Sequence, residues 1–204
     1  MSTIVLATAN PNKVEELSLP LCLNGFDVKP QTDFFSEQVE EDGLSFIENA
    51  LKKARFASAK TGLPAIADDS GLQVDALNGR PGIFSARFAE ILGFSESSEE
   101  ENTRQLVKAL EGFPLADRKA NYICAVVYVA HENDETPLIG IGTWHGDILT
   151  EPRTQYGIGY DPVMWIPSEL KAASEVPLER KLQISHRAKA MESVINQIKQ
   201  REAK

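Results

Sequence analysis

The sequence predicts an α/β fold with a mixed β-sheet flanked by helices, and three observations lead to that prediction. Short apolar runs of strand length alternate with amphipathic stretches of helix length along the 204 residues. Turn sequences rich in Gly, Pro and acidic residues separate them, without an internal repeat, low-complexity tract or linker. The hydrophobic content of 42% and the charged content of 25% are ordinary for a soluble globular protein. We therefore expect one domain over residues 1–204.

The first half of the chain is expected to contain two helices and four strands. Pro20 should kink or end the first helix, because proline removes a backbone hydrogen bond. Gly62 is placed to close the second helix, where left-handed backbone angles are common. The expected elements are a strand at 4–7, a helix at 12–21, a short strand at 26–28, an acidic loop at 38–42, a helix at 45–61 and strands at 64–67 and 72–77.

The second half is expected to add three strands and two helices. Residues 94–102 are rich in Ser and Glu, which predicts an exposed, mobile loop. Ser185 is placed to cap the last helix. The expected elements are a helix at 103–110, an antiparallel pair of strands at 120–130 and 137–144, a short strand at 163–166 and a helix at 186–203.

Composition and charge argue against nucleic acid and membranes as partners. The net charge of −9 argues against a surface that coats nucleic acid. No apolar run is long enough to span a bilayer, and the first residues lack the basic region of a signal peptide. Cys22 and Cys124 lie far apart in apolar context, which predicts buried free thiols. We therefore expect a cytoplasmic protein without nucleic-acid or membrane partners.

Adjacent carboxylates at Asp68 and Asp69, directly after the apolar run 63–67, are the first chemical candidate. Ligands of α/β folds gather at the carboxyl ends of strands, and carboxylates there suit Mg2+, which prefers oxygen ligands. A strand that simply ends in a polar turn explains the segment equally well, because Asp, Ser and Gly favour turns. The acids at 40–42 would join the same Mg2+ site if folding brings them there, and otherwise form a solvated loop.

Residues 8–13 are the second candidate, because they run from a strand through a turn into a helix. Free amides at a helix N-terminus suit phosphate, and Lys13 adds a positive charge. The segment lacks the spacing of a Walker A loop, and Thr and Asn are also ordinary helix caps. A phosphate contact and a plain helix cap therefore both fit this segment.

Two segments in the second half could contact a nucleoside. Residues 157–162 combine glycines with Tyr160 and Asp161, which offer a flat face and an acceptor, although a plain turn also fits. His186 and Arg187 follow Ser185 at a helix N-terminus, where the dipole disfavours cations. Donors in that place could contact a carbonyl oxygen or a phosphate, or could form only a cap with solvent-facing charge.

Taken together, these segments resemble the inosine triphosphate pyrophosphatase family, the XTP/dITP diphosphatases, over nearly the whole chain. Any one of the matching motifs is modest evidence, but coincidence does not explain all of them in this order. The motifs are Thr8-Ala9-Asn10 with Lys13, Phe46-Ile47-Glu48-Asn49-Ala50 with Lys53, Ala67-Asp68-Asp69-Ser70-Gly71-Leu72, Pro81-Gly82-Ile83-Phe84-Ser85-Ala86-Arg87-Phe88, Gly159-Tyr160-Asp161-Pro162 and Ile184-Ser185-His186-Arg187.

The resemblance implies a twisted mixed sheet in an elongated, two-lobed α/β domain, with the active-site cleft between the lobes, and a homodimer. It implies Mg2+-dependent hydrolysis of the non-canonical purine nucleoside triphosphates ITP, dITP and XTP to monophosphate and pyrophosphate. Asp69 would be the proton acceptor and a metal ligand, and Glu40 or Glu41 would be a further metal ligand. The phosphates would contact Thr8, Ala9, Asn10, Pro11, Asn12, Lys13, Lys53 and Ser70, and the nucleoside would contact Ile158, Gly159, Tyr160, Asp161, Lys181, His186 and Arg187.

Two other functions stay open. A related pyrophosphatase could act on another modified nucleotide, and a nucleotide sensor could bind without turnover, although a pure sensor has no need of a base at Asp69. The chain also departs from the family's usual pattern. Ala9 stands where Gly is common, and Ile158 stands where Phe is common. Loss of the ring at 158 removes stacking worth about 1 kcal/mol, which predicts a looser base pocket.

Overall fold

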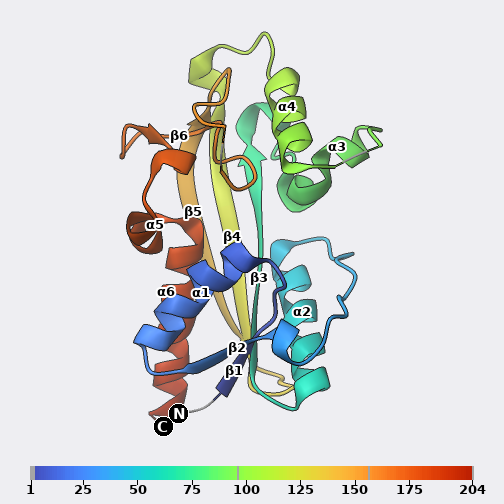
Figure 1. Ribbon diagram of the computed structural model, residues 1–204, viewed down its shortest axis with the longest axis vertical. Helices are drawn as coiled ribbons and strands as arrows, with labels where there is room; N and C mark the ends of the chain where they lie inside the picture. The colour runs from blue at the N-terminus through green and yellow to red at the C-terminus, as the bar shows by residue number, and fades with distance from the viewer. Residues whose placement is uncertain (1–2, 96, 156, 204) are drawn as a thin grey trace. The chain divides into compact units, whose positions relative to one another are not determined.

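A computed structural model describes residues 3–95, 97–155 and 157–203. Its sheet is mixed, as predicted, because β1 pairs in parallel with β2 and β3, whereas β6 pairs antiparallel with β5 and β7 (Figure 1). The strand order is β2-β1-β3-β4-β5-β6-β7. The strands are β1 (Thr3–Leu6), β2 (Asp27–Pro30), β3 (Ala65–Val74), β4 (Lys119–Val129), β5 (Leu138–Ile148), β6 (Met164–Ile166) and β7 (Lys171–Ala172).

Helices connect β1 to β2, β2 to β3 and β3 to β4, and the chain divides into two compact units. Unit 1 contains Met1–Asp69, Cys124–Thr143 and Leu182–Lys204, and unit 2 contains Ser70–Ile123 and Trp144–Lys181. No helix in the described part of the chain is long and apolar enough to cross a membrane. The α-helices of the described residues are α1 (Pro11–Leu23), α2 (Phe46–Thr61), α3 (Phe88–Ile91), α4 (Glu99–Ala109), α5 (Leu178–Ile184) and α6 (His186–Glu202).

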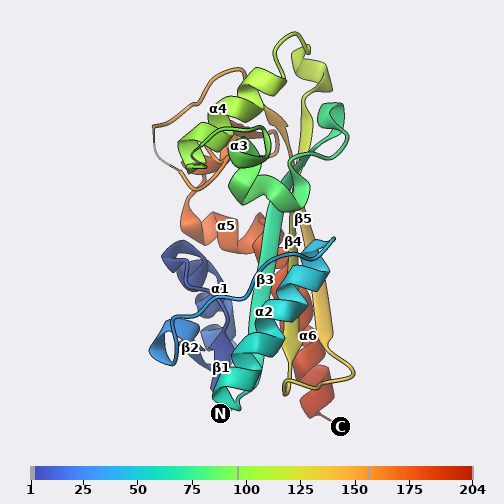
Figure 2. The same cartoon turned by 90° about the vertical axis from the view of Figure 1, so that its right-hand side faces the viewer.

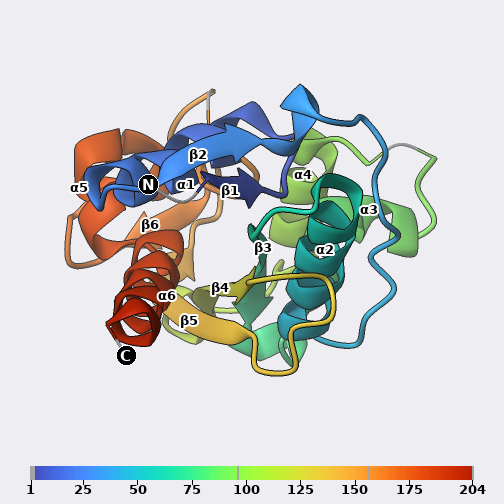
Figure 3. The same ribbon diagram turned by 90° about the horizontal axis from the view of Figure 1, so that it is seen from below.

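Unit 1 has three layers, with helices on both faces of the sheet (Figure 3). Successive strand residues point to opposite faces, so each strand contributes to two separate apolar clusters. On one face α1 and α6 lie side by side and cover residues such as Ile4, Ile66 and Val126. On the other face lies α2 (Figure 2). Its small side chains Ala50, Ala54 and Ala57 pack closely on the sheet residues Val5, Ala7, Ala65, Ala67, Val127 and Val129.

Local sequence explains where the helices of unit 1 begin and end. Asn10 caps α1, with Pro11 in the first turn, where a missing N–H costs nothing. Ser45 caps α2 by accepting from the Glu48 amide at 3.2 Å, and Gly62 ends α2 with a φ of 69°. Ser185 caps α6, as predicted.

Three local predictions are wrong, and one of the two alternatives for Pro20 does not hold. The sequence predicts that Pro20 kinks or ends the first helix; α1 does not end there but continues to Leu23, because one lost hydrogen bond near a helix end is tolerated. Cys22 is exposed on that last turn, whereas Cys124 is buried as expected. The loop predicted at 94–102 is shorter, because Ser98 caps α4 and three glutamates favour its first turn; residue 96 lies outside the described residues. Finally, the strand predicted at 72–77 is part of β3 and ends at Val74.

Strand β3 is the most consequential of these differences. The sequence predicted two strands separated by an acidic turn at 68–71, but one strand runs through Asp68, Asp69, Ser70 and Gly71 without a break. Asp68 and Asp69 are buried, so their carboxylates need partners inside the protein. The polar residues are therefore held on a rigid strand rather than on a flexible turn.

Glycine at two positions of β5 lets α6 approach the sheet. A Cβ at Gly142 would overlap the carbonyl oxygen of His186, and one at Gly140 would overlap that of Ala190.

We expect Gly142→Ala to lower the free energy of unfolding by about 1–3 kcal/mol, because the backbone must shift to admit the methyl group. Urea denaturation measures this, with Ile141→Val as an exposed control on the same strand. A Gly142→Ala protein as stable as the control would show that α6 moves away from the sheet without lowering the free energy of unfolding.

Unit 2 has its own buried core around the remaining strand segments. Helices α3 and α4 pack together, and the buried Asn102 of α4 ties them by accepting from the Ala89 amide at 2.7 Å. The buried Arg118 donates to the carbonyl oxygen of Leu110 at 2.9 Å and so closes the segment that follows α4. The large buried side chains of this unit include Leu72, Phe88, Leu106, Leu110, Tyr122, Trp144, Ile148, Tyr160, Met164 and Ile166.

Candidate active site

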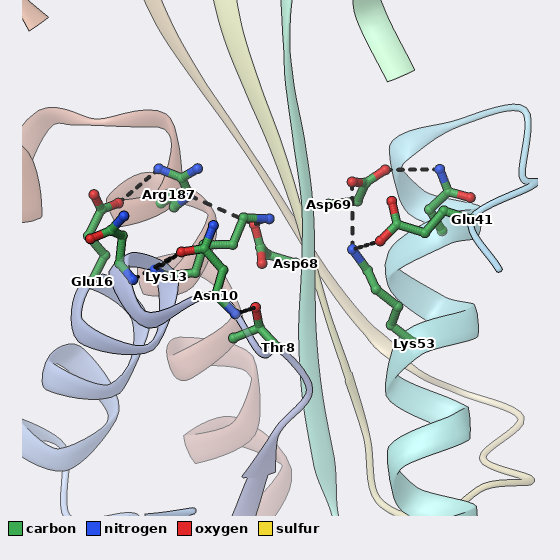
Figure 4. Close-up of polar contacts among 11 residues, drawn as sticks. Thr8, Asn10, Lys13, Glu16, Glu41, Lys53, Asp68, Asp69 and Arg187 are labelled. Atoms are coloured by element: carbon green, nitrogen blue, oxygen red, sulfur yellow. Dashed lines mark hydrogen bonds and ion pairs between the residues drawn. The ribbon is translucent and has the colours of Figure 1, made fainter. Parts of the chain in front are cut away.

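Asp68 and Asp69 lie on opposite faces of β3, as neighbouring strand residues must (Figure 4). Asp68 points toward the side of α1 and α6, and Asp69 points toward α2. The two carboxylates therefore take part in two different sets of ion pairs. The sequence had placed both, with the acids at 40–42, in one candidate Mg2+ site.

Asp68 belongs to a buried network of two acids and two cations. Its Oδ2 lies 2.8 Å from Lys13 Nζ and 3.8 Å from Arg187 Nε. Arg187 also donates from Nη1 to Glu16 Oε2 at 2.9 Å. Lys13 and Glu16 stand on α1, three residues apart on the same helix face, and Arg187 lies in the first turn of α6. The network joins the first turns of two helices to the centre of β3.

Asp69 belongs to a second group, formed with α2 and the loop before it. Lys53 Nζ lies 2.8 Å from Glu41 Oε1 and 3.6 Å from Asp69 Oδ1, so two carboxylates face one ammonium (Figure 4). The other oxygen of Asp69, Oδ2, accepts from the Asn49 side-chain amide at 3.0 Å. Neighbouring acids at 40 and 42 lie outside this group, because Glu40 is exposed and Asp42 pairs with Lys52.

The turn at 8–13 is organised by its own side chains. Asn10 Oδ1 accepts from the amides of Asn12 and Lys13 at 3.0 and 3.4 Å, and Thr8 Oγ1 accepts from the Asn10 amide at 3.2 Å. The amides of Asn12 and Lys13, which the sequence analysis proposed as phosphate donors, thus donate to the Asn10 side chain. Ala9 is exposed, and the described non-glycine residues with positive φ are Asn78 and Leu170, so a methyl at position 9 causes no backbone strain.

In unit 2, Asp161 is buried and held from two sides. Tyr122 donates its hydroxyl to Asp161 Oδ1 at 2.9 Å, and Lys181 Nζ lies 2.6 Å from Oδ2. Tyr160 is also buried, and its hydroxyl donates to the Ser85 carbonyl at 2.7 Å. Its ring is therefore part of the core, and burial raises the pKa of its hydroxyl. The flat face that the sequence offered at Tyr160 is packed against protein.

The predicted site residues thus form definite groups within each unit. Unit 1 brings Lys13, Asp68 and Arg187 together, and separately brings Glu41, Lys53 and Asp69 together. His186 is buried at the start of α6 in the same unit, whereas Ser70 and the segment 158–161 with Lys181 belong to unit 2. Ile158 and Gly159 are half-buried there, and the Gly159 carbonyl accepts from Thr103 at 3.1 Å.

Sequence reasoning missed three residues whose side chains bind predicted site residues. Glu16 pairs with Arg187, Asn49 donates to Asp69, and Tyr122 donates to Asp161. Glu16 offered a weak signal, since it stands one helical turn after Lys13 and directly before the apolar Leu17. Asn49 lies inside a matching motif, and Tyr122 offered no signal, because an aromatic residue in an apolar strand is ordinary.

The oxygen donors of the second group suit a hard divalent cation. Within the described residues there is no cluster of three or more His, Cys, Asp or Glu side chains of metal-site geometry. Glu41 and Asp69 nevertheless converge on one positive charge, the Lys53 ammonium. Mg2+ needs only one or two carboxylates when waters and phosphate complete its shell, so this pair fits such an ion.

The surroundings shift the pKa values of the two aspartates in opposite directions. Burial alone would raise the pKa of Asp68, but Lys13, Lys53 and Arg187 outweigh burial and hold that pKa well below its usual range. Burial raises the pKa of Asp69, and Lys53 and Asn49 offset only part of this effect. Burial by itself would lower the pKa of Lys53. The negative charges of Asp68, Asp69 and Glu41 outweigh burial, so the pKa of Lys53 is raised.

The lowered pKa of Asp68 predicts loss of stability in acid. The unfolded carboxyl takes up its proton near pH 4, whereas the folded one resists it, so the stabilisation is complete above about pH 4. Below that pH the unfolded state binds more protons, and the free energy of unfolding falls as the pH approaches the folded pKa. Urea denaturation at pH 3 and pH 7 measures this, and an Asp68→Asn protein should lose less on acidification. Equal losses in both proteins would contradict the assignment.

Comparison with known proteins gives a consistent result. Residues 4–197 match the family model described as the Ham1 family. The chain is 47% identical over 199 residues to a Photobacterium profundum protein named dITP/XTP pyrophosphatase, a match that covers 98% of this chain and 99% of that one. It is 48% identical over 198 residues to a Vibrio parahaemolyticus protein of the same name, covering 97% of each.

Solved structures agree with these matches. A HAM1 protein from Coxiella burnetii has a TM-score of 0.87 and 40% identity, covering 98% of this chain and all, 100%, of that one. A nucleoside-triphosphatase / dITP/XTP pyrophosphatase from Mycobacterium abscessus has a TM-score of 0.72 and 38% identity, covering 91% of this chain and 95% of that one.

Proposed function

Because this chain belongs to the Ham1 family, we propose that it hydrolyses the non-canonical purine nucleoside triphosphates ITP, dITP and XTP to monophosphate and pyrophosphate. The names of the relatives at 47% and 48% identity support this substrate class. The observation in this chain that carries the proposal is the Asp69 carboxylate, buried and turned toward Lys53 and Glu41. A protein that only bound nucleotides would have no need of a base held in this way.

Asp69 acts as the proton acceptor in this proposal. Attack of water on the α-phosphorus requires removal of a proton, and Asp69 Oδ1 is the oxygen that accepts it because Oδ2 is engaged by Asn49. The raised pKa of Asp69 makes this carboxylate a better base than an ordinary aspartate. Lys13 and Lys53 offset the negative charge that develops on the departing pyrophosphate. The phosphates contact Ser70 and the remaining polar groups of Thr8 to Lys13, since the cap engages the amides of Asn12 and Lys13.

We assign the divalent metal to Glu41 and Asp69, and we take the ion to be Mg2+. When bound, it supplies a positive charge to the phosphate oxygens and activates the attacking water. Asp68 has a different role, which is to orient Lys13 and Arg187 as their counter-ion. Lys53 lies beside both carboxylates and supplies a positive charge for the phosphates.

The base is recognised by donors that fit a 6-keto purine. His186 and Arg187 donate to the keto oxygen of hypoxanthine or xanthine, whereas adenine presents an amino group there, which cannot accept from them. Within unit 2, the resemblance assigns the nucleoside to Asp161, which Tyr122 and Lys181 hold, and to residues 158–160, of which Tyr160 keeps its ring in the core. The homodimer carries over from the family resemblance, and the cytoplasmic location from the two free cysteines, as parts of this proposal.

The direct test is pyrophosphate release from ITP, dITP, XTP, GTP, ATP, dUTP and dTTP, each with and without Mg2+. We expect metal-dependent release from ITP, dITP and XTP and little from ATP. Release from a different modified nucleotide alone would replace the substrate class and keep the chemistry. Tight binding of one nucleotide without release would identify a sensor and overturn the role of Asp69.

A further inference from the structure

Asn49 connects the loop that carries Glu41 to the carboxylate of Asp69. It stands in the first turn of α2 and is 1% exposed. Its Oδ1 accepts from the Gly43 amide at 2.8 Å, and its Nδ2 donates to Asp69 Oδ2 at 3.0 Å. One buried side chain thus bridges two segments whose carboxylates both face Lys53.

The chemistry of the two partners determines how the Asn49 amide is oriented. A backbone N–H can only donate, so the carbonyl oxygen of the amide must face Gly43. The NH2 group then faces Asp69, whose ionised carboxyl can only accept. The amide therefore engages Asp69 Oδ2 and leaves Oδ1 turned to Lys53, at 3.6 Å.

Gly43 is required for this bridge to close. A Cβ at Gly43 would lie 2.6 Å from Asn49 Oδ1 and 2.8 Å from the Glu48 Cβ, closer than real side chains approach. Gly43 follows Glu41 by two residues, so its anchored amide also limits where the Glu41 carboxylate can lie. Both ends of the bridge thus act on a group that faces the Lys53 ammonium.

We propose that Asn49 is a positioning residue for the hydrolysis. It holds the Glu41 loop at a constant distance from Asp69 and selects Oδ1 as the oxygen of Asp69 that faces the reacting groups. This inference rests on the proposed function for the reaction that it serves. Residues that orient ligands or catalytic carboxylates in this way change activity by about tenfold to a hundredfold when they are removed.

The test compares Asn49→Ala with a matched control, Asn102→Ala. Asn102 is likewise buried, at 3% exposure, and likewise bridges two segments, accepting from Ala89 and donating to the Ala86 carbonyl at 3.0 Å, but it has no charged partner in the site. We expect Asn49→Ala to lower kcat on dITP, per folded molecule, by about tenfold to a hundredfold with KM changed by less than about threefold. Asn102→Ala should lower thermal stability similarly and leave kcat unchanged.

Gly43→Ala should break the hydrogen bond between the residue 43 amide and Asn49 Oδ1 while Asn49 itself is kept. We expect it to reproduce the loss of kcat, and we expect both variants to speed hydrogen exchange at the amide of residue 43, which the bridge protects in the wild type. A kcat reduced only in proportion to the folded fraction in Asn49→Ala, or equally reduced in Asn102→Ala, would overturn the proposal. So would protection at residue 43 that survives Asn49→Ala.

Failure of the proposed function would look different. It would appear as a wild-type protein that releases no pyrophosphate from any nucleotide of the panel. In that case a positioning role in hydrolysis falls with the reaction, whereas hydrogen exchange at residue 43 still reports whether Asn49 holds the loop. A wild type that turns over dITP together with an unaffected Asn49→Ala variant would overturn only the bridge.

Discussion

Replacing Asp69 with Asn is expected to abolish turnover while leaving nucleotide binding largely intact. The amide keeps the size of the carboxyl and can still accept from Asn49, but it cannot take a proton from water. A positioned base contributes about 10²-fold to 10⁴-fold to a rate, and we expect kcat on dITP to fall by that amount. Pyrophosphate release measures the rate, and calorimetric titration with dITP measures the binding.

The same substitution should stabilise the protein at neutral pH. The pKa of Asp69 is raised in the fold, so its ionised form costs stability at every pH above that folded pKa. Asn carries no charge and avoids this cost. The advantage of Asp69→Asn should disappear below about pH 4, where the carboxyl is neutral in both states. Full activity in Asp69→Asn would show that another group is the base, and a variant less stable than the wild type would contradict the assigned direction of the pKa.

Replacing the neighbouring Asp68 with Asn should have the opposite effect on stability. Asp68 is 1% exposed and offsets Lys13 and Arg187, whose charges would lose their buried partner. We expect the free energy of unfolding to fall by about 2–3 kcal/mol, in the range for loss of one member of a buried, hydrogen-bonded ion pair. Arg187 keeps Glu16, which moderates the loss.

Urea denaturation of both variants at pH 7 tests the pair of predictions together. One chemical change at adjacent positions should move the unfolding free energy in opposite directions, because the two side chains enter different surroundings on the two faces of β3. Stabilisation of both variants would mean that the charge network on the Asp68 side does not stabilise the fold, and destabilisation of both would contradict the raised pKa of Asp69. An exposed acid, Glu15→Gln, serves as the control for loss of charge alone.

Much of the fold follows from local patterns. The strands β1 and β6 and the helix α6 lie within a few residues of their predicted bounds, because apolar periodicity and capping residues such as Ser185 act locally. The short helices α3 and α5 and the strand β7 were not predicted. Their segments are too short for a periodic pattern, so packing within the tertiary structure determines them.

The sequence by itself determined which chemical groups are candidates for the site. Asp69, Lys13, Lys53 and Glu41 were identified as candidates from residue type, spacing and resemblance, since those properties are written in the order of the chain. The tertiary structure decided how these groups are shared. It ran β3 straight through the predicted acidic turn, and the alternation of a strand then sent Asp68 to Lys13 and Asp69 to Lys53.

The structure also supplied the partners that orient the site. Glu16 reaches Arg187 across 171 positions of sequence, and Asn49 reaches Asp69 across 20. Such contacts depend on where helices pack against a sheet, which no local pattern records. The burial that raises the pKa of one aspartate and the cations that lower the pKa of the other arise in the same way, because a carboxylate titrates according to everything that surrounds it in space.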